Sequence, residues 1–258
     1  MLSEQKIKRQ LNTELLGRRV VLLPVVESTN SYAKELAAAG EPEGTLVVAE
    51  HQTAGRGRWG RSFFSTEGTG IYLSLVLRPE LAPQKAVLLT SMTAVAAARA
   101  IDAVSGLHSG IKWVNDIFLN GKKVCGILVD AGINPADGRL SYAIVGIGIN
   151  VGQMEFPKEL QKVATTVSNE CGREISREEL IAAVVNEMER LYPTCATGDF
   201  LKESRERSVL LGREIRILDP VHGEEAAKAV EIDGQGQLVV EIGGKRRILN
   251  SGEVSIRF

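Results

Sequence analysis

Cysteine and histidine are scarce in this chain of 258 residues. The three cysteines, Cys125, Cys171 and Cys195, are odd in number and widely spaced, and no Cys-x-x-Cys string occurs. The sequence therefore predicts neither a disulfide framework nor a zinc site, and this cysteine usage is typical of a reducing cytoplasm. With only three histidines, a histidine-based metal centre is not expected.

An excess of either charge is also absent. Lys and Arg number 31 against 32 Asp and Glu, which gives a formal net charge of −1. A general affinity for nucleic acid or for an anionic membrane is therefore not expected, and any anion site must be local. The longest stretch without a charged side chain, Leu140–Met154, is too short to cross a membrane, and the charged start of the chain does not resemble a signal peptide.

What is present is a globular composition, with 44% apolar and 24% charged residues. Apolar runs predict strands over 19–26, 45–50, 71–77 and 141–150. Capping residues and periodicity predict helices over 29–39, 83–104 and 177–191. Asn120-Gly121 predicts a hairpin turn between residues 117–119 and 123–130.

The tail changes character near Gly212, where short apolar runs alternate with Asp233-Gly234 and Gly243-Gly244. This pattern predicts a small antiparallel barrel or sheet of about 45 residues. We therefore expect two domains, residues 1–208 and residues 209–258.

A loop rich in glycine and arginine follows the second predicted strand. Residues 52–61 read Gln-Thr-Ala-Gly-Arg-Gly-Arg-Trp-Gly-Arg and satisfy G-x-G-x-x-G, but no helix follows as a dinucleotide site requires. Arg56, Arg58 and Arg61 could instead place guanidinium groups on phosphate or carboxylate. The alternatives are a solvated basic loop or an RNA-binding segment.

Two short polar strings have both a structural and a functional interpretation. Ser28, Thr29 and Asn30 could simply cap a helix, or could hold polar groups of a ligand at its N-terminus. Asn115 and Asp116 could form a turn, or Asp116 could hold Mg²⁺ on a nucleotide phosphate.

Lys123 lies in an otherwise apolar strand. It could point to solvent, or into a cleft where it would neutralise a carboxylate or an α-phosphate. Gly126 nearby would let a ligand approach the backbone closely.

Taken together, five strings resemble the biotin protein ligase family in order and spacing: 27–30, 52–61, 112–116, 123–128 and 146–150. The resemblance implies an α+β fold, in which a mixed β-sheet catalytic domain is related to class II aminoacyl-tRNA synthetases and biotin–lipoate ligases. It also implies a C-terminal SH3-like barrel. The implied activity is ATP-dependent biotinylation of a carrier-domain lysine through biotinyl-5′-AMP.

The resemblance also implies roles for individual residues. Lys123 and Arg58 would be catalytic. Biotin would be bound by Ser28, Thr29, Asn30, Gln52, Gly55, Arg56, Gly57, Arg58, Lys123 and Gly126. ATP would be bound by Arg58, Phe63, Lys112, Asn115, Asp116 and Asn150, and Mg²⁺ by Asp116.

This chain departs from the family pattern at two positions. Phe63 stands where the family often has Trp, and it can still stack on an adenine face. Val114 stands where the family often has Pro. Some family members carry an N-terminal winged helix that binds DNA, for which we see no room, so a repressor role is not expected.

The predicted partner is a biotin carboxyl carrier domain, and a homodimer is possible. Lipoate–protein ligation and non-enzymatic RNA binding remain as alternative functions.

Overall fold

The structure, a computed structural model, describes residues 1–219, 223–249 and 253–255. A seven-stranded sheet frames the larger unit, in the order β1-β2-β3-β7-β6-β5-β4. Only β1 and β2 run parallel, so the predicted mixed sheet is confirmed. The strands are β1 (Val20–Val26), β2 (Leu46–Gln52), β3 (Gly70–Leu77), β4 (Gly110–Lys112), β5 (Asp116–Leu119), β6 (Lys122–Ile133) and β7 (Leu140–Asn150).

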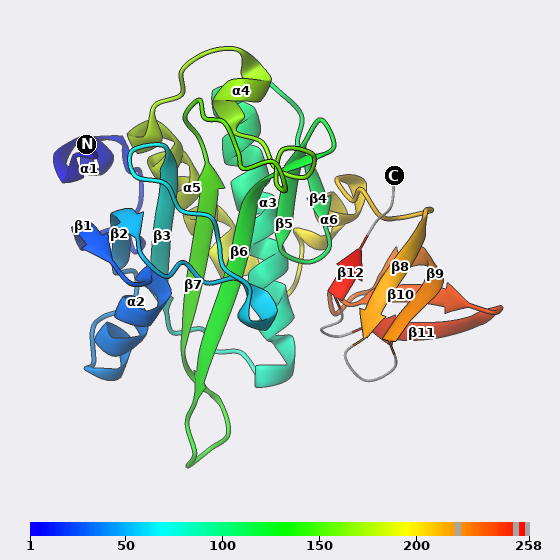
Figure 1. Ribbon diagram of the computed structural model, residues 1–258. Coiled ribbons are helices and arrows are strands. Elements are labelled where there is room, and N and C mark those ends of the chain that lie inside the picture. The colour runs from blue at the N-terminus through cyan, green and yellow to red at the C-terminus, as the bar shows by residue number, and fades with distance from the viewer. Residues whose placement is uncertain (220–222, 250–252, 256–258) are drawn as a thin grey trace.

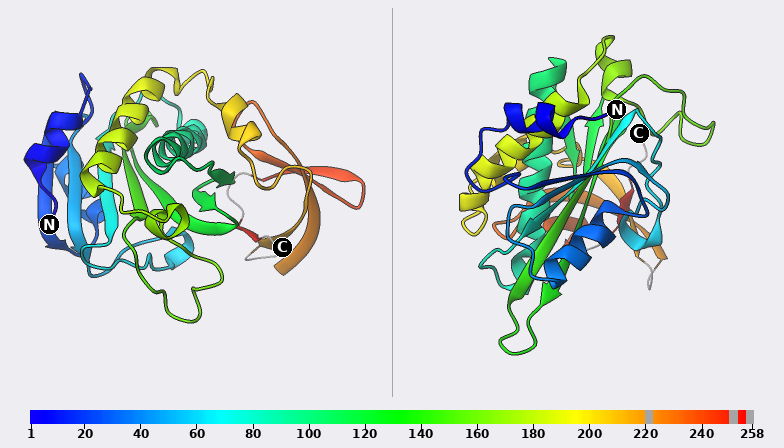
Figure 2. Two further views of the ribbon diagram at one scale, coloured as in Figure 1. Left: turned by 90° about the horizontal axis from the view of Figure 1, so that it is seen from above. Right: turned by 90° about the vertical axis from the view of Figure 1, so that its left-hand side faces the viewer.

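Helices cover the two faces of this sheet unequally, as Figures 1 and 2 show. The long helices α3 and α5 lie against one face, whereas α2 covers only part of the other. The rest of that second face is left for a loop, and the functional cavity lies there. The α-helices are α1 (Glu4–Gln10), α2 (Thr29–Ala38), α3 (Ala86–Ser105), α4 (Val167–Cys171), α5 (Arg177–Leu191) and α6 (Leu201–Glu206).

Local sequence signals explain where these elements begin and end. Ser28 caps α2 and Ser176 caps α5, each with its side-chain oxygen accepting a backbone N–H. Asn120 and Gly121 both have positive φ, 48° and 79°, as a type I′ turn between β5 and β6 requires. The predicted helices and hairpin are therefore confirmed, with boundary shifts of a few residues.

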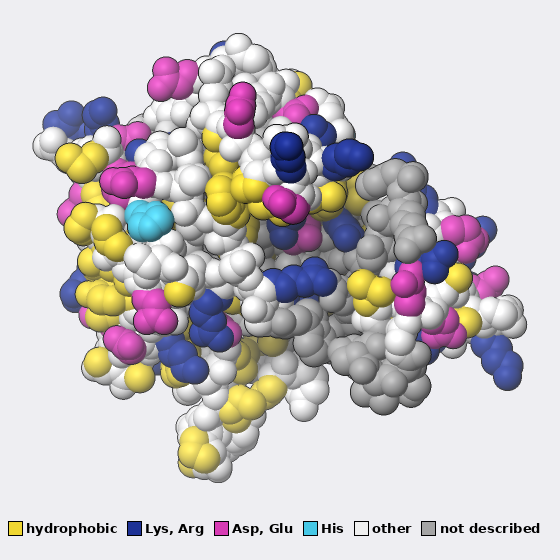
Figure 3. Space-filling view, viewed as in Figure 1, with side chains coloured by type: hydrophobic (Ala, Val, Ile, Leu, Met, Phe, Trp, Pro, Cys, Tyr) yellow, Lys and Arg dark blue, Asp and Glu magenta, His cyan; other side chains and the backbone are white. Residues whose placement is uncertain are grey.

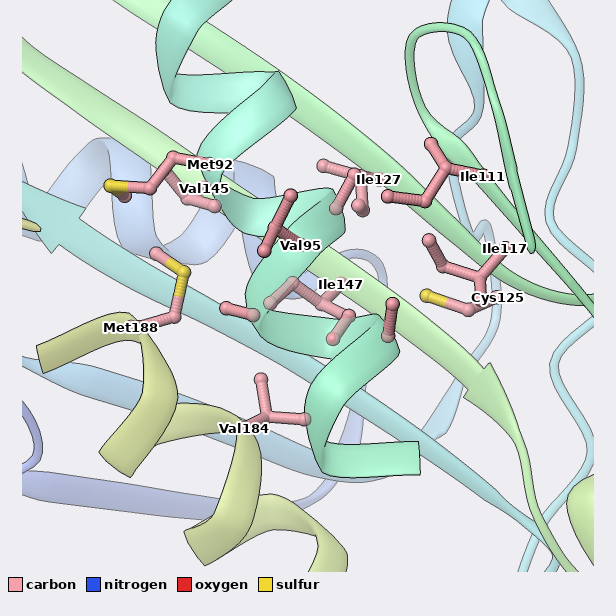
Figure 4. Close-up of a cluster of buried hydrophobic side chains, with 14 of the residues drawn as sticks. Met92, Val95, Ile111, Ile117, Cys125, Ile127, Val145, Ile147, Val184 and Met188 are labelled. Carbon is pink, nitrogen blue, oxygen red and sulfur yellow. The ribbon is translucent and has the colours of Figure 1, made fainter. Parts of the chain in front are cut away.

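The main core lies between the sheet and the helices α3 and α5. In Figure 4, Met92 and Val95 of α3 lie in one cluster with Val145 and Ile147 of β7 and with Val184 of α5. Many of the remaining α3 residues are alanine, and those small side chains let the helix approach both neighbours closely.

One stretch that includes α3, Pro83–Ser105, is long and apolar enough to cross a membrane by length and composition. Since 72% of its most apolar window is buried inside the fold, it has the pattern of a core helix of a soluble protein.

The smaller C-terminal unit is a five-stranded antiparallel sheet in the order β11-β10-β9-β8-β12. It confirms the predicted β unit, although β12 and the length of β9 were not foreseen. Its strands are β8 (Glu214–Asp219), β9 (Gly223–Ile232), β10 (Leu238–Ile242), β11 (Lys245–Leu249) and β12 (Glu253–Ser255). The proposed boundary at 208/209 falls between α6 and β8 and stays a prediction.

The β9–β10 turn of this unit contacts the larger one. The indole Nε1 of Trp113 donates to the carbonyl of Gly236 at 2.9 Å. Arg205 of α6 donates to the carbonyls of Ile232 and Asp233 at 2.6 and 2.9 Å. These bonds tie the C-terminal unit to the string that follows β4 and to α6.

Candidate active site

A cavity of about 170 Å³ lies between the sheet and the loop that joins β2 to β3. On this side of the molecule Lys and Arg side chains gather around a central hollow (Figure 3). The wall is formed by Ser28, Thr29, Asn30, Gln52, Arg56, Gly57, Arg58, Arg61, Ser62, Phe63, Leu73, Lys112, Trp113, Asn115, Asp116, Lys123, Gly126, Ile127, Leu128, Gly146, Ile147 and Gly148.

All but two of the site residues expected from the sequence line this single cavity. Gly55 lies behind the wall, where its carbonyl accepts from the backbone N–H of Phe63 at 2.9 Å. Asn150 lies at the end of β7, and its side chain donates to the carbonyl of Thr165 at 3.2 Å. Neither residue is placed to touch a ligand inside the cavity as it stands.

One end of the cavity is lined by hydroxyl and amide groups that bond to one another. The Gln52 side-chain oxygen accepts from the backbone N–H of Thr29 at 2.8 Å and from its hydroxyl at 3.1 Å. The hydroxyl of Ser74, on β3, lies 2.7 Å from Asn30 Oδ1 and 2.9 Å from Thr29 Oγ1. Ser28, Thr29 and Asn30 are each almost fully buried, so this end offers polar groups that are shielded from water.

The floor of the cavity is made by glycines of β6 and β7. A Cβ atom at Gly146 would lie 1.9 Å from Asn30 Oδ1, and one at Gly148 would lie 2.7 Å from the Phe63 ring. Side chains at these positions would therefore occupy the cavity. The Phe63 ring lies on this floor and meets Tyr72 edge-on, with centroids 6.3 Å apart.

The other end of the cavity carries the cationic side chains. Lys123 Nζ lies 2.7 Å from Asp116 Oδ1, and Gly126 leaves room for the lysine because a Cβ there would lie 3.2 Å from Nζ. Arg58 reaches across from the loop and donates to Asn115 Oδ1 at 3.2 Å. Residues from the loop, from β5 and from β6 thus meet at one point.

The loop itself is folded rather than extended. The backbone N–H of Gly57 donates to the carbonyl of Arg61 at 2.7 Å, and Arg56 forms a β-bridge with Ser62. A short 3₁₀ turn, Arg58–Gly60, closes the tip. This arrangement places Arg56 and Arg58 in the cavity wall, with Arg58 half-buried and Arg56 still exposed to solvent.

Thiol and metal-cluster chemistry find no support among the described residues. Cys125 neighbours the site in sequence but points into the core, where burial raises the pKa of its thiol and keeps it neutral. No group of three or more His, Cys, Asp or Glu side chains that could hold a metal ion occurs in residues 1–219, 223–249 and 253–255. Asp116 is the only carboxylate in the cavity wall formed by these residues.

The predicted site omitted several residues, among them Ser74, Asp130 and Trp113. Ser74 and Asp130 support Asn30 from outside the cavity wall, and Trp113 forms part of the wall. Alternation along β3 could have identified Ser74, since Ser74 stands between inward-facing Leu73 and Leu75 and must face the opposite side of the sheet. Asp130 offered a weaker signal, as the single acid of an apolar strand.

Comparison with known proteins agrees with this geometry. Residues 22–150 match the model of the biotin/lipoate A/B protein ligase family, and residues 210–257 match the biotin protein ligase C-terminal domain. The chain belongs to the biotin/lipoate A/B protein ligase family. The second match places it with the biotin protein ligases of that family, as the five strings had indicated.

Individual relatives are similar over nearly the whole chain. A bifunctional ligase/repressor BirA of Bacillus spizizenii is 41% identical over 93% of this chain and 74% of its own length. A biotin–[acetyl-CoA-carboxylase] ligase of Mycobacterium tuberculosis is 28% identical, covering 96% of this chain and 94% of its own. The biotin protein ligase of Aquifex aeolicus, solved with biotin and ATP, superposes with a TM-score of 0.78 at 28% identity over 93% of this chain and 99% of its own.

Proposed function

We propose that this protein joins biotin to ATP, giving biotinyl-5′-AMP and pyrophosphate, and then transfers the biotinyl group to a lysine of a carrier domain. The observation that carries the proposal is that Arg58 and Lys123, 65 residues apart in sequence, line one cavity whose far end is polar and buried. Such a cavity can hold a polar head group at one end and an acid group against cations at the other.

The buried polar end suits the head group of biotin. Its cyclic urea carries two N–H donors and one carbonyl acceptor, which can pair with Ser28, Thr29, Asn30 and Gln52. The dithiolane ring of lipoate has no such groups, so it would form none of these hydrogen bonds, each of which contributes about 0.5–1.5 kcal/mol net. Biotin is therefore favoured over lipoate, although lipoate ligases belong to the same family.

The cationic end suits the first chemical step. A carboxylate oxygen of biotin attacks the α-phosphorus of ATP, a new O–P bond forms, and the bond to the pyrophosphate oxygen breaks. Two anionic groups must approach each other, and Lys123 and Arg58 offset their repulsion in a site shielded from water. Asn115 holds the Arg58 guanidinium in place for this task.

A magnesium ion fits the residues present. Mg²⁺ is usually held by one or two carboxylates together with nucleotide phosphates and water, and Asp116 supplies one carboxylate beside the cations. The ion would neutralise phosphate charge when bound. Asp116 would then share its charge between the ion and Lys123.

The second step needs a protected intermediate. The lysine amine of the carrier attacks the acyl carbon, a C–N bond forms, and AMP leaves as the C–O bond breaks. Water would destroy the adenylate in the same way, so a covering loop is needed. The cavity of about 170 Å³ is smaller than ligand pockets of roughly 300–1,000 Å³, which supports a loop that moves outward to admit both substrates.

The family membership disfavours a non-enzymatic RNA-binding module. We further propose a biotin carboxyl carrier domain as partner and the cytoplasm as location. A homodimer is proposed from the edge strand β1, which among the strands that the structure describes pairs with β2 alone and which exposes Val25. Its test is the mass of the protein in solution, and a monomer at all concentrations would contradict it.

Release of pyrophosphate tests the main proposal. It should require biotin and Mg-ATP together, and lipoate or octanoate in place of biotin should support it poorly. Release that is supported equally by lipoate would contradict the choice of substrate. No release with any of the three acids would contradict the proposed activity.

A further inference from the structure

The Asn30 amide is held at the polar end of the cavity by three protein groups that come from three different residues. Its Nδ2 donates to the carbonyl of Leu128 at 3.2 Å and to Asp130 Oδ2 at 2.9 Å. Its Oδ1 accepts from the hydroxyl of Ser74 at 2.7 Å. Both amide hydrogens therefore bond to acceptors on β6, on the side away from Ser74.

Only one orientation of this amide is compatible with its neighbours. A backbone carbonyl and an ionised carboxylate are both acceptors, so the group that faces them must be the NH₂. The oxygen is then directed toward Ser74 and the glycine floor, where Gly146 leaves it room. Asn30 thus presents an acceptor, and not a donor, to whatever occupies this end.

Asp130 is the charged member of this arrangement and lies outside the cavity wall. A hydrogen bond to a carboxylate is stronger than one to a neutral acceptor, so Asp130 contributes more to the amide's orientation than Leu128 does. Without it, one amide hydrogen loses its partner, and only the bond to the Leu128 carbonyl and the Ser74 hydroxyl still oppose a turn of the amide. A turned amide would present N–H groups to the N–H groups of a cyclic urea.

We propose that Asp130 is a positioning residue which, by fixing the Asn30 amide, sets the selectivity of the cavity for an acid whose head group carries N–H donors. The inference rests on the proposed function and adds to it a determinant that never touches the substrate. Its effect is confined to the head-group end, because the cations and Asn115 lie at the opposite end of the cavity.

The test compares three aspartate variants by steady-state kinetics and by calorimetric binding of biotin. Asp130→Ala should raise the KM and the Kd for biotin about 10-fold while kcat and the KM for ATP change less than about 2-fold. Asp130→Asn retains an oxygen acceptor and should restore most of the affinity. Asp137→Ala, in the exposed turn beyond the same two strands, should behave as the wild-type chain does.

Selectivity gives a second measure. The preference for biotin over lipoate, expressed as the ratio of kcat/KM values, should narrow in Asp130→Ala and stay wide in Asp130→Asn. Melting curves with and without biotin show whether each variant is folded.

Three results would overturn the inference. The first is an unchanged biotin affinity in Asp130→Ala, and the second is a loss of biotin affinity in Asp130→Asn as large as that in Asp130→Ala. The third is a fall in kcat and a rise in the KM for ATP that are as large as the change in the KM for biotin. If the wild-type chain and Asp130→Ala bind biotin with the same Kd, this inference is refuted but the proposed function is not. An absence of biotin binding by the wild-type chain refutes the proposed function as well.

Discussion

Replacement of Lys123 by alanine is the most direct test of the cationic end of the cavity. The ammonium lies 2.7 Å from Asp116 and above Gly126, and no other lysine on β6 lines the cavity. The variant removes the positive charge and leaves the Asp116 carboxylate facing the site alone. Adenylate formation should then become slow because two anionic groups approach each other with less compensation.

The expected magnitudes for rate and for stability differ widely. Removal of one group that stabilises developing charge typically costs about 3–4 kcal/mol, or about 10²–10³ in rate. A partly exposed ion pair contributes only about 0–1 kcal/mol to stability. For a chain of this length that corresponds to a fall of about 0–4 °C in Tm. The variant should therefore be folded and almost inactive.

The assay separates the two chemical steps. Pyrophosphate release measures adenylate formation, and transfer from supplied biotinyl-5′-AMP to a carrier domain measures the second step. In Lys123→Ala, the rate of pyrophosphate release should fall far more than the rate of transfer from biotinyl-5′-AMP. Lys122→Ala is the matched control, since this neighbouring lysine on β6 does not line the cavity.

A folded Lys123→Ala variant with near-normal pyrophosphate release would remove this lysine from the mechanism. An equal loss in Lys122→Ala would instead point to a general effect of charge on β6.

The remaining predictions concern the loop, the floor and the core. Arg58→Gly should speed the dissociation of biotinyl-5′-AMP about 10-fold, measured by filter binding, and an unchanged rate would count against a covering role. Gly146→Ala should displace Asn30 and weaken biotin binding by calorimetry while nucleotide binding is kept, whereas normal biotin affinity would contradict the crowding argument. Arg177→Met should lower the free energy of unfolding at pH 7 by about 3–5 kcal/mol in urea titrations, because it leaves the buried carboxylate of Glu50 without its arginine partner. Burial alone would raise the pKa of Glu50, but hydrogen bonds from Arg177 and the Leu2 backbone outweigh it and hold the pKa below its usual value. The wild-type stabilisation is therefore fully present above the pKa of the unfolded chain and is lost as the pH falls through the folded pKa. A variant whose stability at pH 7 equals that of the wild type would refute the ion-pair argument.

Much of this fold could be predicted because its signals are local. Ser28 and Ser176 cap helices through bonds three residues away, and Asn120-Gly121 forms its turn through its own backbone angles. The short elements β4, α4 and α6 were missed because three to six residues carry too little periodicity. Their positions are set by packing against the long strands and helices.

The site shows the same division between local and distant signals. The five strings could be recognised in the sequence because each is continuous, but their convergence on one cavity depends on the strand order of the sheet. Ser74 and Asp130 act through Asn30 from strands 44 and 100 residues away. Each is a polar exception in an apolar strand, but nothing in the sequence shows that both bond to Asn30. The role of a residue that positions another is identified only when the structure shows the contact between the two.

The contact between Trp113 and Gly236 extends this argument to the whole chain. The two residues are 123 positions apart, and their bond joins the C-terminal sheet to the string that carries Asn115 and Asp116. Trp113 is buried in the cavity wall, and Gly236 has a φ of 78°, a left-handed backbone conformation that favours glycine. The C-terminal unit is therefore part of the support of the cationic end, although none of its described residues lines the cavity. A short sheet that is only marginally stable alone gains stability from this docking, and the string after β4 gains a fixed position from the same bond.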